Sequence, residues 1–230
     1  MKHLILFAMA TAGSAASAAT PNPDRPSVSR SGFLVAQNTL EMETGLAFQD
    51  RATTVPTTLK YSVAGVVEPR LSADFSGFDN GTPALEAGAK IRILDSTDIG
   101  LAAFAASAVP MGSETWVGTA QALVTLPFDR GLSLQFNGGV LVTPQGLGIP
   151  LVGAFGFPIT GNFSGFVEVA AVFADGRCPG ACASSSEVID GGLAWGLTEI
   201  LTVDTGLGYS LSDAQLFGAA GLTANFGAFR

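Results

Sequence analysis

The sequence predicts an all-β fold, a transmembrane antiparallel up-and-down β-barrel of about twelve strands that follows a cleaved signal peptide. Apolar side chains recur at every second position in runs of about ten residues. That is the period of a strand and the length of one that crosses a bilayer at a tilt. The chain of 230 residues is 47% hydrophobic and only 13% charged, with a mean hydropathy of +0.41. Its longest apolar run after the leader, Ile99–Pro110, is too short for a membrane-spanning helix, which needs about 18 residues.

The first residues have the features of a secretory signal peptide. Lys2 and His3 give a positive start, Leu4–Ala10 is a short apolar core, and the small residues that follow offer a cleavage site near residue 18 or 19. We therefore expect residues 1–19 to be removed on export. Residues 20–39 are rich in proline and serine and are expected to form a periplasmic N-terminal segment that could enter the barrel mouth.

Period-two runs then fill residues 40–230, which we assign to one outer-membrane barrel. The predicted strands cover, in order, 40–49, 58–63, 70–76, 86–93, 99–109, 116–128, 132–142, 151–157, 163–173, 189–198, 202–210 and 222–226. The connections are expected to alternate between long and short, beginning with a long one at 51–56, as in barrels with external loops and periplasmic turns.

The hairpin formed by 116–128 and 132–142 shows which face should meet lipid. Trp116, Val124, Phe136 and Val140 fall in one phase, whereas Gln121, Gln135 and Asn137 fall in the other. A water-soluble barrel would place apolar residues inside and charges outside. Here the apolar phase is almost free of charge, so we expect it to face lipid and the polar phase to line a lumen.

The charged residues of the polar phase are the candidate site. They are Glu41, Glu43, Lys60, Arg70, Asp74, Glu86, Lys90, Arg92, Glu168, Asp190 and Asp204. Lys60, Arg70 and Arg92 lie near short turns on neighbouring strands, so an ion-pair ladder with Glu41 and Glu43 is predicted at the periplasmic end. Two interpretations stay open: the charges pair to fill the lumen, or they form a constriction that selects solutes by charge.

The sequence offers few residues for catalysis, metal binding or nucleic-acid binding. Removal of the leader removes His3, the one histidine, and no zinc spacing or phosphate-binding loop is present, so we expect no enzyme activity, no metal and no cofactor. The acidic balance disfavours nucleic acid. Cys178 and Cys182 are the only cysteines, and export to an oxidising compartment favours a disulfide in their loop over a metal or redox role.

Several short motifs resemble a known family. They are Asp24-Arg25-Pro26-Ser27, Leu40-Glu41-Met42-Glu43-Thr44-Gly45, and Leu59-Lys60-Tyr61-Ser62 followed across a turn by Arg70-Leu71. With the strand rhythm, they resemble the outer-membrane transporter family called putative MetA pathway of phenol degradation. The chain departs from the usual aromatic end of such barrels, because Arg230 follows Phe229.

The resemblance implies a pore or uptake channel. We therefore expect a channel in the outer membrane of a Gram-negative bacterium for passive uptake of small solutes, with hydrophobic or aromatic compounds among the candidates. The expected partners are outer-membrane lipid, the solute and the barrel-assembly machinery. The alternative is a structural or surface-binding barrel that conducts nothing.

Overall fold

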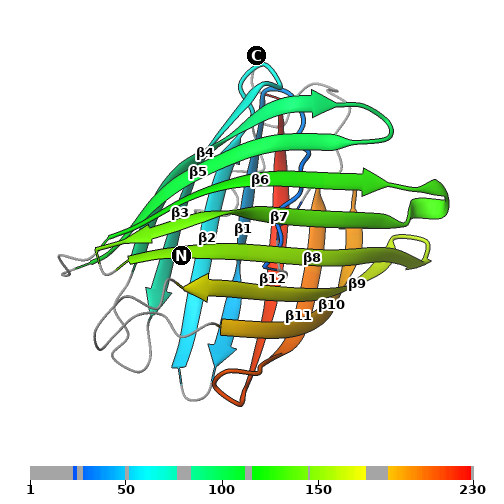
Figure 1. Ribbon diagram of the computed structural model, residues 1–230. Coiled ribbons are helices and arrows are strands. Elements are labelled where there is room, and N and C mark those ends of the chain that lie inside the picture. Colours follow the sequence, from blue (N-terminus) through cyan, green and yellow to red (C-terminus); the bar gives the residue numbers. More distant parts are fainter. Residues whose placement is uncertain are drawn as a thin grey trace, which may run out of the picture.

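The computed structural model describes residues 23–24, 28–49, 52–76, 84–111, 116–144, 146–174 and 186–228. In these ranges twelve antiparallel strands close into a barrel, because each strand pairs with its sequence neighbours and β1 pairs with β12 (Figure 1). The elements are β1 (Thr39–Gln49), β2 (Ala52–Tyr61), β3 (Val67–Ser76), β4 (Ala84–Asp95), β5 (Gly100–Pro110), β6 (Val117–Pro127), η1 (Asp129–Gly131), β7 (Ser133–Thr143), β8 (Gly146–Thr160), β9 (Phe163–Ala174), β10 (Ser186–Thr198), β11 (Leu201–Ser210) and β12 (Gln215–Ala228). The predicted fold class is confirmed.

The strands β5 to β8 cross the view of Figure 1 at a steep angle to β1, β2 and β12. Tilt of this kind is what closing a sheet into a barrel requires. The described ranges contain no helix long and apolar enough to cross a membrane.

Some strand boundaries differ from the prediction. The expected long loop at 51–56 is wrong, because β2 already begins at Ala52 and only residues 50 and 51 separate it from β1. Thr53, Thr54 and Val55 are β-branched, which favours extended backbone, and the two threonines pair with β1. Pro56 lies opposite Asp74 of β3 and is accommodated within the strand.

The same error affects β8 and β12. The predicted connection at 144–148 is mostly strand, since β8 begins at Gly146, and β12 begins at Gln215 rather than near 222. Glycine and proline suggested breaks, but pairing with neighbouring strands keeps these stretches extended, since Gly146 pairs with Thr143 of β7 and Gln215 pairs with Ser210 of β11. The regular alternation of long and short connections is therefore absent.

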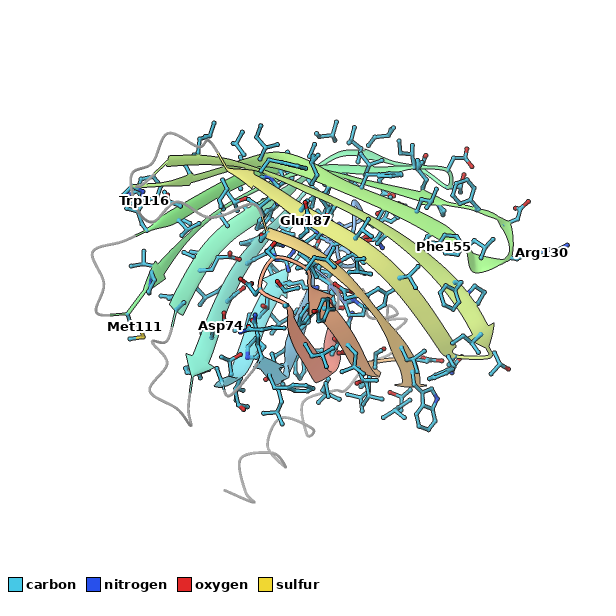
Figure 2. The ribbon with its side chains drawn as sticks, turned by 60° about the horizontal axis from the view of Figure 1, so that its bottom comes forward. Asp74, Met111, Trp116, Arg130, Phe155 and Glu187 are labelled. Atoms are coloured by element: carbon cyan, nitrogen blue, oxygen red, sulfur yellow. The ribbon has the colours of Figure 1, made fainter. Side chains whose placement is uncertain are left out.

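Opposite ends of the barrel are visible in Figure 2. Met111 and Trp116, beside the β5–β6 connection, lie at one side of the view, and Arg130, in the turn between β6 and β7, lies at the other. We call the end with Arg130 the terminal end, because β1 begins there and β12 ends there, and the end with Trp116 the loop end. The predicted polar turn at 129–131 is present as η1, and Arg130 and Gly131 adopt positive φ angles of 63° and 78°.

The barrel is polar inside and apolar outside. Among the described residues, six buried side chains are hydrophobic and twenty are polar or charged. Large apolar side chains are instead exposed, including Phe136 at 47%, Val167 at 53% and Leu207 at 65%. Water-soluble proteins bury such residues, whereas barrels in lipid expose them. The predicted orientation of the β6–β7 hairpin is found, with Trp116 and Val140 exposed and Asn137 buried.

Two expectations concern residues outside the described ranges. The signal peptide, residues 1–19, is one of them. The cysteine pair, Cys178 and Cys182, is the other.

Candidate functional site

Three cations stand side by side on the inner face of β2, β3 and β4. Lys60 lies directly opposite Arg70 in the β2–β3 ladder, and Lys90 lies opposite Glu68 in the β3–β4 ladder. All three are buried, Arg70 at 7% exposure and the two lysines at 1% or less. Period two places them on one face, so the sequence pattern of neighbouring strands brings three positive charges together.

Carboxylates of the barrel wall pair with these cations. Glu41 and Glu43 of β1 both form ion pairs with Lys60, and the Oε1 of Glu41 lies 3.0 Å from the Lys60 Nζ. Glu68 lies 3.6 Å from the Arg70 guanidinium and 3.7 Å from the Lys90 ammonium. We call these six side chains the wall cluster: Lys60, Arg70, Lys90, Glu41, Glu43 and Glu68. Buried charges are stable in a protein only when they are paired in this way.

A seventh group comes from outside the strands. The Asp24 carboxylate lies 2.5 Å from the Arg70 guanidinium, 3.6 Å from the Lys60 ammonium and 3.9 Å from the Lys90 ammonium. Its backbone N–H donates to Glu43 at 2.8 Å. Burial alone would raise the pKa of the Asp24 carboxyl, but the surrounding cations hold that pKa well below its usual value.

Asp24 belongs to a stretch of chain that lies inside the barrel. We call residues 23, 24 and 28–38 the lumen segment. Its backbone N–H groups donate to side chains on five different strands around the barrel, β1, β3, β6, β7 and β9. Side chains from such widely separated strands can meet one stretch of chain only in the interior, so the segment occupies the lumen.

The wall opposite the cluster receives the middle of the segment. Glu168 of β9 accepts the N–H groups of Val28 and Ser29 at 2.7 and 2.8 Å. Asn137 of β7 accepts the N–H of Arg30 at 2.6 Å and donates its amide to the carbonyl of the same residue at 2.8 Å. One side-chain amide thus satisfies both polar groups of one residue, as a neighbouring strand would.

The end of the segment returns toward the wall cluster. Gly32 donates its N–H to the Thr125 hydroxyl at 2.8 Å, and Val35 donates to Glu68 at 2.8 Å. The Lys90 ammonium donates to the carbonyl of Phe33 at 3.2 Å. Gly32 packs so closely on β5 that a Cβ atom there would lie 2.3 Å from the carbonyl oxygen of Gly100. Only glycine fits this position without displacing the backbone.

A small apolar layer lies beside these polar contacts. Phe104, Ala102 and Leu123 form the buried apolar cluster, against which Leu34 of the lumen segment packs. The guanidinium of Arg30 lies over the Phe104 ring, 4.5 Å from its centre. A cation over an aromatic face is stabilised when it is shielded from water.

The remaining predicted residues lie apart from the wall cluster. Asp190 of β10 is the cross-strand neighbour of Glu168, and Asp204 is buried on β11. Together they make β9 to β11 an acidic side of the lumen. Among the described residues, no group of three or more His, Cys, Asp and Glu is placed to hold a metal ion.

Three predicted residues belong neither to the wall cluster nor to the acidic side of the lumen. Arg92 pairs with Asp95 at 3.4 Å near the terminal end of β4, and its side chain is 36% exposed. Asp74 is exposed toward the loop end of β3, as Figure 2 shows, and Glu86 is half-buried on β4.

Sequence reasoning missed Asp24, Arg30 and Glu68. Glu68 keeps the inward phase of Arg70, and this phase could have identified it. The two segment residues carry no strand periodicity, so no local pattern places them in the lumen.

Comparisons with known proteins agree on the fold. No family model matches the chain, and no curated protein matches it. The KdgM porin in complex with disordered oligogalacturonate matches with 9% identity over 83% of this chain and 99% of its own, at a TM-score of 0.67. The NanC porin matches with 7% identity over 80% of this chain and 98% of its own, at a TM-score of 0.66. The COG4313 outer membrane channel from Pseudomonas putida F1 matches with 12% identity over 89% of this chain and 99% of its own, at a TM-score of 0.58.

At these identities the likeness concerns the fold. The chain has the barrel architecture of outer-membrane porins and channels. The resemblance to the phenol-degradation family receives no support from a family model.

Proposed function

We propose that the protein is an outer-membrane channel for small polar solutes whose lumen is closed by its own N-terminal segment. The observation that carries the proposal is the inverted distribution of side chains, with apolar residues exposed outside and charged residues buried inside. An apolar outer face favours lipid, and a charged inner face favours water and polar solutes. The polar lining disfavours hydrophobic and aromatic compounds, which the sequence resemblance had suggested as candidate solutes.

The lining also supports a charge preference. On the wall, six buried acids, Glu41, Glu43, Glu68, Glu168, Asp190 and Asp204, face three buried bases, Lys60, Arg70 and Lys90, in the described part of the chain. An excess of carboxylates along a narrow lumen attracts cations and repels anions. The open channel is therefore proposed to prefer cations.

A second candidate is a structural barrel that conducts nothing. The observation in its favour is the lumen segment itself, which is held by hydrogen bonds on several sides. The two candidates differ in what happens when the segment leaves. A channel then conducts, whereas a structural barrel, filled by its other side chains, does not.

A single substitution separates them. Gly32→Leu places a side chain where even a Cβ would lie 2.3 Å from a backbone oxygen, so it should expel the segment and leave the wall unchanged. The matched control is Gly153→Leu, where a Cβ would make only ordinary contacts with exposed Phe136 and Val169. In planar bilayers, Gly32→Leu should conduct far more often than the native chain and Gly153→Leu should not. Equally rare conductance from a folded, inserted Gly32→Leu variant would refute the channel and favour the structural barrel.

The membrane location has its own test. The protein should fractionate with outer membranes and require detergent for extraction. Recovery of folded protein from the soluble periplasmic fraction would contradict both candidates.

A further inference from the structure

The lumen segment shows what kind of molecule the wall can bind. Its contacts with the side chains of Glu168, Thr125 and Glu68 all come from backbone N–H groups. Asn137 takes both an N–H and a carbonyl from one residue. At these positions the wall therefore binds polypeptide backbone.

The wall cluster adds a second requirement. Arg70, Lys60 and Lys90 converge on one carboxylate, that of Asp24, within 2.5 to 3.9 Å. Arg70 approaches this carboxylate more closely than it approaches Glu68, which is 3.6 Å away. Any carboxylate of similar size could make the same charge-assisted contacts.

We propose that the lumen is a binding site for short oligopeptides that carry a carboxylate, and that the lumen segment occupies this site in their absence. The carboxylate would bind Arg70 and its neighbouring lysines, and peptide N–H groups would reach Glu168 and Asn137. This inference rests on the proposed channel function, because a peptide reaches the wall only through an open end of the barrel. It goes beyond that function by naming the solute.

The contacts also explain why such a peptide fits better than a neutral sugar of similar size. Five wall side chains, Glu43, Glu168, Asn137, Thr125 and Glu68, accept backbone N–H groups of the segment, the first at residue 24 and the last at residue 35. A peptide presents one backbone N–H donor for each residue other than proline. A neutral sugar offers hydroxyl groups but no carboxylate for Arg70.

The test measures binding directly, in the full chain and in detergent. The probe is a fluorescent, end-blocked peptide of alanine and serine as long as the 24–35 stretch, with one aspartate near its start. Fluorescence anisotropy should show binding to Gly32→Leu at least tenfold tighter than to the native chain, because the native segment competes. Asp24→Asn, which changes no volume, is the second variant and should shift binding in the same direction if Gly32→Leu does not fold.

Two altered peptides test the two requirements separately. Replacing the aspartate by asparagine removes the carboxylate, and N-methylation removes backbone donors. Each change should weaken binding at least tenfold. Binding that is unaffected by both changes, or seen only with a peptide of the chain's own 23–38 sequence, would overturn the inference and leave the segment as a plug alone.

Conductance of the same variants keeps the two proposals distinguishable. A Gly32→Leu barrel that conducts but does not bind the probe refutes the peptide site and retains the channel. A barrel that binds the probe but never conducts refutes the channel and retains the peptide site.

Discussion

Asp24→Asn should open the channel, because Asp24 fixes the start of the lumen segment. The substitution keeps the size of the side chain and the backbone N–H that donates to Glu43. It removes the negative charge that faces Arg70 at 2.5 Å and the two lysines at 3.6 and 3.9 Å. The carboxylate is only 7% exposed, so water cannot replace it while the segment stays bound.

The magnitude follows from the charges around Asp24. With the segment bound, four cations, Lys60, Arg70, Lys90 and Arg30, lie among five carboxylates, Glu41, Glu43, Glu68, Asp24 and Glu86. Removing one carboxylate from a buried network costs about 3 to 5 kcal/mol. Asparagine retains neutral hydrogen bonds, so we take the lower value. About 3 kcal/mol corresponds to a shift of roughly a hundredfold from the bound toward the released segment.

Single-channel recording in planar bilayers measures this shift as the open fraction of time. We expect Asp24→Asn to raise it by roughly two orders of magnitude. Asp98→Asn is the matched control, because Asp98 is exposed in the β4–β5 connection. If the two variants have the same open fraction, Asp24 does not hold the segment, and the charge argument is wrong.

The remaining predictions concern selectivity, pH and the cysteines. Glu168→Gln should lower the cation-over-anion permeability ratio of an open channel, measured as a reversal potential, whereas Glu199→Gln in the exposed β10–β11 turn should not. Because the cations lower the pKa of Asp24 in the folded state, its stabilisation of the bound segment is fully present above the ordinary carboxyl pKa and is lost only as pH falls through the lowered value. The open fraction should therefore be insensitive to Asp24 titration between pH 7 and about 5, and a rise in that window that Asp24→Asn abolishes would contradict this. Mass spectrometry after alkylation without reductant should find Cys178 and Cys182 unlabelled, and labelling of both would contradict the predicted disulfide.

The barrel could be predicted from the sequence because its signal is local and repeated. Every strand shows period two over at least part of its length, so errors at Pro56 or Gly146 move a boundary without changing the fold. Those errors share one cause. Proline and glycine disfavour an isolated strand, but pairing with a neighbouring strand, β3 for Pro56 and β7 for Gly146, outweighs this preference.

The candidate site was only partly predictable. Phase alone places Lys60, Arg70 and Glu41 on the inner face, and pairing register brings them together. The phase of a residue shows which face of the strand it lies on, but not how far along the barrel axis it lies. Arg92 therefore shares the phase of Lys90 but pairs with Asp95, outside the wall cluster. Asp24 lies in a proline-containing stretch without periodicity, and its place depends on contacts with strands far along the chain.

The central claim is that the lumen segment is bound inside the barrel, and amide hydrogen exchange of the native chain tests it most directly. The N–H groups of Val28, Ser29, Arg30, Gly32 and Val35 donate to side chains of the wall. We predict that they exchange orders of magnitude more slowly than free peptide amides and that Gly32→Leu removes this protection while the strands stay protected. Exchange of these five amides at free-peptide rates in a native chain with protected strands would contradict the claim.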